Sequence, residues 1–287
     1  MSQLTDYAEN KLVDMIRAQA WALPANLYAA LASAASDSAV TELTGTGYAR
    51  VGLVRALATW AGTQGAGTTT ASSGTGHGSS NNAAVNFGTS GSAWGTQNYL
   101  VLYDAATGGN AICVFPVPQL VIGSGQAVSI NAGVLAFTLG LSGGCSDYLA
   151  NKLIDFIFRG QAFTFPTPMY EALLTAAPSN AGGGTEVAGG VGYARVSVAG
   201  SLANWAGTQA AGSTTASTGT GGQTSNNAAI TFGTPTGSWG TLGWDAEYDA
   251  SSAGNLLFWA PLANTKTVGS GSTPPSFAAG TRTITFA

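Results

Sequence analysis

The chain has 287 residues, a net charge of −4 and only 8% charged residues, against about 25% in an average soluble domain. Its isoelectric point near 4.7 and its lack of any basic run argue against nucleic-acid binding, and no apolar run approaches the ~18 residues of a membrane-spanning helix. Low charge combined with 45% apolar residues indicates a surface largely covered by other protein, and the charge alone equally fits an ordinary acidic soluble protein. The start lacks the basic and apolar segments of a signal peptide, so we expect a protein made in a cytoplasm.

The first predicted element is a helix over residues 5–20, capped by Thr5 or Asp6, because apolar residues recur there at helical spacing. A second helix is predicted over residues 146–161. Short apolar segments bounded by Gly, Asn, Pro or Ser predict strands at residues 27–34, 48–54, 83–87, 99–103, 111–117, 127–131, 134–139 and, in the second half, 169–176. This pattern predicts a mainly β fold of antiparallel sandwich or jelly-roll-like domains, each with a short N-terminal helix.

The second half of the chain repeats the first in the same order. The recurring landmarks are Asp6-Tyr7 and Asp147-Tyr148, Gly47-Tyr48-Ala49-Arg50 and Gly192-Tyr193-Ala194-Arg195, Trp60-Ala61-Gly62-Thr63-Gln64 and Trp205-Ala206-Gly207-Thr208-Gln209, Ser80-Asn81-Asn82 and Ser225-Asn226-Asn227, Trp94-Gly95-Thr96 and Trp239-Gly240-Thr241, Asp104-Ala105 and Asp249-Ala250, and Gly109-Asn110 and Gly254-Asn255. A unit this long is a domain rather than a solenoid turn. We place the domains at residues 1–141 and 142–287, called the first and second repeat, and expect them to superpose, each around its own core.

Two stretches of small polar residues, 65–80 (loop 1) and 210–225 (loop 2), are equivalent in the two repeats. Such segments are costly to order alone. We therefore expect both loops to carry partner contacts or to face outward together, with a partner or a neighbouring subunit supplying the ordering contacts. His77 in loop 1 is the only histidine, and the second repeat has Gly222 there. We interpret His77 as an exposed loop residue that can be replaced by Gly without loss of assembly.

No residue set in the sequence indicates an enzyme. A general base shared by both repeats cannot be a histidine, since only His77 exists. Asp14 and Asp155 are interpreted as helix-surface carboxylates, and Asp104 and Asp249 as turn caps, so no catalytic carboxylate pair recurs. No spacing typical of a metal site occurs, and we expect no cofactor.

The two cysteines do not occupy equivalent positions, because Cys113 matches Phe258 and Cys145 falls near Leu4. Repeats stapled by disulfides would each keep a pair. We interpret Cys113 as a small core residue. Cys145 lies at the junction, where its thiol could be exposed, and a single Cys113–Cys145 bridge stays open.

Four tryptophans recur close to Gly-Thr: Trp60, Trp94, Trp205 and Trp239. Together with His77 they are the candidate interface or binding residues. Aromatic rings beside small polar residues could form a sugar-stacking or protein-docking surface, and they could equally be core anchors at strand starts.

Two arginines stand in otherwise uncharged strands, Arg50 and Arg195. In so charge-poor a chain, we expect each to pair with a carboxylate such as Glu42 or Glu186 rather than with a ligand.

Several of the recurring segments resemble small tailed-phage virion proteins that are often labelled "phage tail fibre protein". The match is best in the second repeat, at Thr175-Ala176-Ala177-Pro178-Ser179, Gly182-Gly183-Gly184-Thr185-Glu186-Val187, Gly192-Tyr193-Ala194-Arg195 and Gly254-Asn255-Leu256-Leu257-Phe258. The resemblance covers both repeats, although such proteins usually carry a single unit. It implies a virion structural protein without catalytic residues, and it leaves head or tail open.

Our first expectation is a capsid decoration or cement protein on the head exterior. The chain lacks coiled-coil heptads and fibrous repeats and begins with a globular unit, and a duplicated domain can bridge two near-equivalent lattice sites. The alternative is a tail-fibre or baseplate component with receptor or glycan binding, and a carbohydrate-binding module using the tryptophans is a third possibility. Expected partners are the major capsid protein or other virion proteins and further copies of the chain, as a trimer or pseudo-symmetric ring, with no nucleic acid or membrane.

Overall fold

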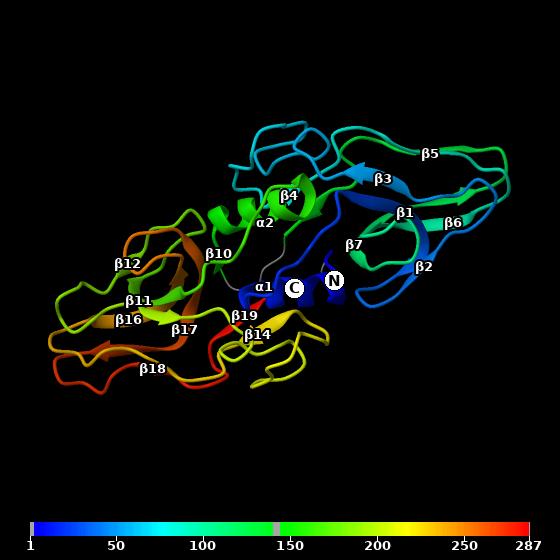
Figure 1. Cartoon of the computed structure of the whole chain (residues 1–287). Helices are drawn as coiled ribbons and strands as arrows, with labels where there is room; N and C mark the ends of the chain where they lie inside the picture. Colours follow the sequence, from blue (N-terminus) through cyan, green and yellow to red (C-terminus); the bar gives the residue numbers. More distant parts are fainter. Residues whose placement is uncertain (1–2, 140–143, 287) are drawn as a thin grey trace.

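The computed structural model describes residues 3–139 and 144–286 of the chain. In these residues the protein is mainly β, with antiparallel sheets and two helices, as predicted. The helices lie at the centre and the two large sheets at opposite ends of an elongated molecule (Figure 1). Neither helix in the described part of the chain has the length and apolar character needed to cross a membrane.

Both predicted helices are present, and each has a hydroxyl cap. Helix α1 (Asp6–Ile16) begins after Thr5, whose side chain accepts a hydrogen bond from the Ala8 amide. Helix α2 (Asp147–Arg159) begins after Ser146, which accepts from the Leu149 amide in the same way. Both helices end earlier than predicted, because the backbone turns left-handed just beyond them, at Ala18 (φ 60°) and at Gly160 (φ 69°).

The two repeats share one strand topology. In the first repeat the sheet order is β2 (Val40–Glu42), β1 (Asn26–Ala35), β6 (Gly95–Tyr103) and β7 (Ala111–Ile122), with β3 (Val51–Val54) also paired to β1. In the second repeat the equivalent order is β12 (Thr185–Glu186), β11 (Met169–Ala176), β16 (Gly240–Tyr248) and β17 (Leu256–Val268), with β13 (Val196–Val198) also paired to β11. A further short strand, β10 (Gly144–Cys145), is added beside β17. The registers agree as well, since Tyr28 lies opposite Tyr103 and Tyr170 opposite Tyr248.

Each repeat also has two small two-stranded sheets. In the first repeat they join β5 (Val85–Thr89) to β8 (Ala127–Ile130) and β4 (Gly78–Ser79) to β9 (Phe137–Thr138). In the second they join β15 (Ile230–Thr231) to β18 (Ser276–Phe277) and β14 (Gln223–Ser225) to β19 (Thr283–Thr285). Loops 1 and 2 therefore each end in a short strand, β4 and β14, that the sequence did not predict.

Strand β7 continues to Ile122, although its prolines predicted an end at Val117. The register with β6 shifts between Gln97 and Tyr99, opposite Pro116 and the residues after it. A bulge in an outer strand accommodates prolines, because the missing amide is not needed for the sheet.

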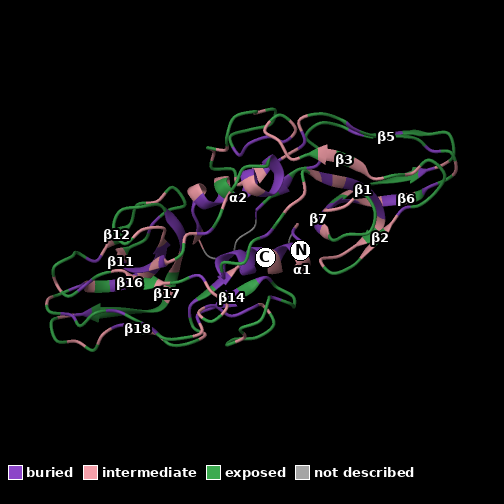
Figure 2. Ribbon diagram, viewed as in Figure 1, coloured by how far each residue is buried: buried purple, intermediate pink, exposed green. Residues whose placement is uncertain are grey.

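The expectation of a separate core in each repeat is only partly met, because each repeat has small clusters of its own but the main core is shared. The largest hydrophobic cluster contains residues of both repeats, from Leu4 and Leu12 of the first to Leu153 and Phe286 of the second. The Phe158 ring of α2 lies 5.1 Å from the Trp60 ring of the first repeat, between centroids. Buried residues lie on the helices and on the strands of the large sheets, while the distal loops are mostly exposed (Figure 2). Each helix packs between its own sheet and the other repeat. The division between residues 141 and 142 therefore separates the repeats in the sequence, whereas the core contains residues of both.

Candidate functional site

The four recurring tryptophans are core residues. Trp60 and Trp205 are fully buried, and Trp94 and Trp239 are 3% exposed. The indole N–H groups of Trp94 and Trp239 each donate to a backbone carbonyl, at 3.0 and 2.8 Å. The rings offer no surface to a sugar or a protein in this structure. Of the two roles considered, these positions fit that of core anchor.

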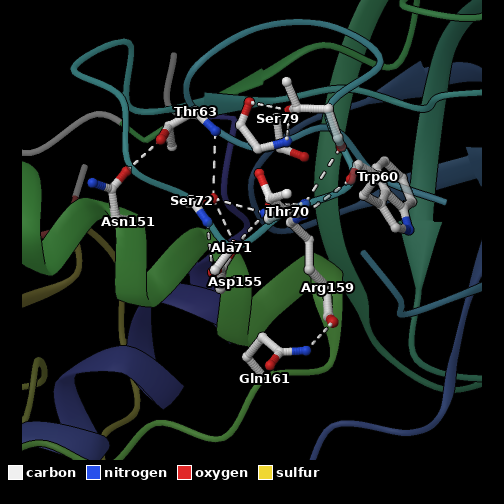
Figure 3. A network of polar contacts seen from close by, with 12 residues as sticks. Trp60, Thr63, Thr70, Ala71, Ser72, Ser79, Asn151, Asp155, Arg159 and Gln161 are labelled. Atoms are coloured by element: carbon white, nitrogen blue, oxygen red, sulfur yellow. Dashed lines mark hydrogen bonds and ion pairs between the residues drawn. The ribbon is translucent and has the colours of Figure 1, made fainter. Parts of the chain in front are cut away.

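Loop 1 is held by the helix of the second repeat (Figure 3). The fully buried Arg159 guanidinium donates to the carbonyl oxygens of Trp60 at 3.0 Å and Thr70 at 2.5 Å. It also pairs with Asp155 at 2.7 Å. The Asp155 carboxylate accepts from the backbone amide and the hydroxyl of Ser72, at 2.9 and 2.6 Å. We call these residues the first clasp.

Loop 2 is held by α1 of the first repeat in the same way. Arg17 donates to the Trp205 carbonyl at 2.9 Å and pairs with Asp14 at 2.8 Å. Asp14 accepts from the amide and the hydroxyl of Ser217, at 3.0 and 2.7 Å, and the Ser213 carbonyl also accepts from Arg17. This is the second clasp. We had expected an outside partner or a neighbouring subunit to order the two loops. In the structure, strong contacts to each loop come from the other repeat of the same chain.

The clasps also correct the interpretation of Asp14 and Asp155 as surface carboxylates, since both are only 6% exposed. Sequence reasoning missed Arg17 and Arg159 altogether. One signal was present: each of these aspartates is followed by an arginine, three residues later at the C-cap of α1 and four residues later within α2. Both spacings place the two side chains on one helix face.

His77 is not an exposed loop residue. Its side chain is 15% exposed, and its Nε2 lies 2.6 Å from the Asp147 carboxylate in the first turn of α2. The neighbouring hydroxyl of Ser79 donates to the Ala61 carbonyl at 2.7 Å and not to the imidazole. The arrangement therefore holds loop 1 against α2 and provides no hydroxyl activated by His77.

A cluster of charged side chains is buried in the second repeat. Arg282 Nε lies 3.3 Å from a Glu171 oxygen and 3.1 Å from an Asp245 oxygen, and its Nη2 lies 3.8 Å from Glu247. Burial raises the pKa of Glu171 well above its usual range, and burial raises the pKa values of Asp245 and Glu247 as well, against the opposing charge of Arg282. By sequence offset and pairing, the first repeat has apolar residues at these positions: Ala29, Leu100, Leu102 and Leu135.

This charged cluster has no access to solvent that would suit a reaction centre, because all its members are at most 5% exposed. No group of His, Cys, Asp and Glu in residues 3–139 and 144–286 is suited to hold a metal ion. The cluster is therefore a structural feature of the second repeat.

Two equivalent surface pockets lie beside the helix starts. The first, of about 350 Å³, is lined by Asp6, Tyr7, Tyr103 and Asn110 among others. The second, of about 280 Å³, is lined by their counterparts Asp147, Tyr148, Tyr248 and Asn255. The recurring Asp-Tyr and Gly-Asn landmarks thus meet at one place in each repeat, where hydroxyl, amide and carboxylate groups face a polar hollow.

Near the first pocket, burial and the negative charge of Asp6 raise the pKa of Asp37. Burial and the charge of Asp104 raise the pKa of Tyr7. Both effects disfavour further negative charge in this hollow. Its chemistry suits neutral, hydrogen-bonding groups better than anions.

The predicted pairing of the strand arginines is confirmed. Arg50 lies 2.7 Å from Glu42, and Arg195 lies 2.7 Å from Glu186. Each guanidinium also lies over a tyrosine ring, that of Arg50 3.4 Å from the Tyr103 ring centre. These arginines are thus used within the fold.

The turn-cap interpretation of Asp104 and Asp249 is confirmed as well. Each carboxylate accepts from the backbone amide six residues later, at 2.6 Å.

Both cysteines are free thiols, and both are buried. Burial raises their pKa values, so the neutral thiols are favoured. The idea that Cys145 is exposed is wrong, because it lies in β10 opposite Phe258, whereas Cys113 lies opposite Leu4. The pair Leu4–Cys113 in the first repeat is thus equivalent to the pair Cys145–Phe258 in the second. The cysteine is the later residue of the first pair and the earlier residue of the second.

A family model described as "Podophage GP4 fiber I protein gp80" matches residues 3–138 and, a second time, residues 144–285. The chain belongs to this family. The two matches coincide with the two repeats, which confirms both the resemblance to tailed-phage proteins and the tandem duplication. No curated protein matches the chain. Membership of a fibre family makes this chain a virion structural protein; head decoration gains no support from it, and the fibre alternative fits it better.

Proposed function

We propose that this chain is a non-enzymatic component of a podophage tail fibre. The observation that carries the proposal is the match of both repeats to a podophage fibre family. The duplication then gives one chain two equivalent units, and hence two copies of every surface that a single unit would offer to the particle.

Several features support a structural role. The one histidine holds a loop against a helix, and the recurring tryptophans are buried. The arginines of the two clasps pair with carboxylates of the fold, and so do Arg50 and Arg195. The chemically versatile side chains are thus used for stability, as in a protein whose task is to hold a shape.

Association with other virion proteins is part of the proposal. Leu120 and Val121 are 45% and 64% exposed in the outer strand β7. Apolar side chains on an outer strand favour contact with a neighbouring chain. The low charge of the whole chain supports the same conclusion.

The position in the particle is the decisive test. Gold-labelled antibody fragments raised against the purified chain should label the tail of intact virions in electron micrographs. Particles made without the gene should keep their head outline and lose fibre density. Label over the head shell would overturn the fibre proposal and support head decoration.

Receptor or glycan binding is the second candidate, and the paired polar pockets favour it. Hydrogen-bonding side chains beside tyrosine rings can hold the hydroxyl groups and the apolar faces of a sugar. Purified protein should then bind host surface polysaccharide, and the double variant Ser38→Tyr/Ala181→Tyr, which fills both pockets, should lose that binding. Absence of binding by the unmodified chain would remove this candidate without affecting the tail-fibre test.

A further inference from the structure

The contact between the two repeats is reciprocal: α1 meets loop 2, and α2 meets loop 1, through equivalent arginines and aspartates. A contact of this kind is the isologous type seen in two-fold dimers, where residue i meets j and j meets i. In a homodimer the two contacts would be identical. Here they differ where loop residue 77 or 222 faces the helix of the other repeat, and that difference has a consequence for pairing.

The difference is in the loops. His77 of loop 1 and Gly222 of loop 2 occupy equivalent positions and share one left-handed backbone conformation, with φ of 50° and 49°. The backbone is therefore conserved between the repeats while the side chain changes from an imidazole to a hydrogen atom.

The residue of the facing helix changes in the opposite direction: it is large where the loop residue is small, and small where the loop residue is large. Against Gly222, a Cβ atom would lie 2.8 Å from the Cβ of Glu9 and 2.5 Å from the Phe286 carbonyl oxygen. Glu9 is 2% exposed and occupies the space that a loop side chain would need. The position of Glu9 in α1 corresponds to Ala150 in α2, which leaves room for the His77 ring to reach Asp147 at 2.6 Å.

We propose that these two residue pairs make the contact selective for unlike repeats. Pairing of the first repeat with another first repeat would set Glu9 against His77, two large side chains in a space for one. Pairing of the second repeat with another second repeat would set Ala150 against Gly222 and leave a gap. Overfilling and cavities both destabilise a packed contact, so the like combinations are disfavoured and the unlike one is selected.

The partner of each repeat at this surface is therefore the unlike repeat, which the same chain supplies. Assembly of several chains in the particle uses other surfaces. This inference concerns the internal contact alone, so it stands or fails separately from the tail-fibre proposal.

The full-length chain allows each mismatched pair to be made and measured on its own. Ala150→Glu sets Glu against His77, and His77→Gly sets Ala150 against a glycine. The double variant Ala150→Glu/His77→Gly recreates the matched pair found between Glu9 and Gly222. Urea denaturation of these variants and the unmodified chain forms a double-mutant cycle. We expect Ala150→Glu to lower the midpoint most, His77→Gly to lower it less, and the double variant to recover a large part of the Ala150→Glu loss.

The control adds a carboxylate to the exposed face of the same helix: Lys152→Glu should shift the midpoint little and show no coupling to His77→Gly. Failure of Ala150→Glu to fold, with folding restored in the double variant, would also support the proposal. Additive shifts, or a double variant as unstable as Ala150→Glu or unable to fold, would overturn it. Gly222 is left unchanged, because any side chain there would strain the backbone as well as meet the Phe286 carbonyl.

Discussion

Arg17 and Trp205 are 188 residues apart in the chain, and the Nε atom of Arg17 donates a 2.9 Å hydrogen bond to the Trp205 carbonyl oxygen. The counterpart bond joins Arg159 to Trp60 at 3.0 Å. Trp60 and Trp205 therefore each contribute in two ways: the ring fills the core, and the backbone oxygen accepts a hydrogen bond from the arginine at the end of the other repeat's helix. The recurring Trp-Ala-Gly-Thr-Gln segment thus lies at the contact between the two repeats.

Replacement of Arg159 by Leu should destabilise the protein by about 3–5 kcal/mol, because it leaves the buried Asp155 carboxylate without its cation. Loop 1 should become the first site of proteolysis, since its carbonyl groups lose their donor. Urea denaturation and limited proteolysis measure both effects. Lys152→Leu on the exposed face of α2 is the control. A loss below about 1 kcal/mol would contradict the importance of the clasp.

The charged cluster of the second repeat can be replaced by the residues of the first. The variant Glu171→Ala/Asp245→Leu/Glu247→Leu/Arg282→Leu should be as stable as the unmodified chain or more stable by about 1–4 kcal/mol, as found when apolar residues replace buried ion pairs. Arg282→Leu alone should be destabilising by about 3–5 kcal/mol, because it leaves three buried carboxyl groups without their cation. Equal losses in both variants would show that removing the three carboxyl groups does not offset the loss of Arg282, and would contradict this account of the cluster.

Stability should fall as the pH rises. Burial raises the pKa of Glu171 in the folded chain above the value of about 4.3 in the unfolded chain. The folded state then holds more protons than the unfolded state at pH values between these two, so its advantage is complete below about pH 4 and is lost as the pH rises through the folded pKa. Unfolding free energies measured from about pH 4 to about pH 8 should show this decrease. The apolar quadruple variant should show a smaller slope; an equal slope would place the titrating groups elsewhere.

Both cysteines should resist thiol reagents in the native protein. Cys113 and Cys145 are buried, and burial raises their pKa values, which disfavours the reactive thiolate. A chromogenic disulfide reagent should label neither thiol under native conditions and both after denaturation. Rapid labelling of one thiol in the native state would show that its strand opens.

Local patterns predicted much of the fold. The cap of the first helix, the start of the second, the positions of β1 and β11 and the pairing of Arg50 with Glu42 follow from residues close together in the sequence. The packing between the repeats could not be predicted in the same way. Asp14 looked like a surface residue because only the fold brings Ser217 to it.

Composition was a weaker guide. Because loop 1 contains few side chains able to build a core, its composition predicted that an outside partner or a neighbouring subunit would order it. Two polar side chains, Arg159 and Asp155, supply strong contacts to it, using the backbone and hydroxyl groups of the loop. Hydrogen bonds from another part of the chain thus contribute to ordering a small-polar loop, and composition does not show where the bonding groups come from.

The reciprocal contact also bears on how such a protein can change by mutation. In a homodimer encoded by one gene, each substitution at an isologous contact appears twice, once on either side of the axis. In this chain a substitution appears once, and the matching site can keep its old residue or change in compensation. Glu9 facing Gly222, and Ala150 at the equivalent place in the helix that faces His77, are two different residue pairs at one matched position. The duplicated chain therefore carries a reciprocal contact with two independently variable sides.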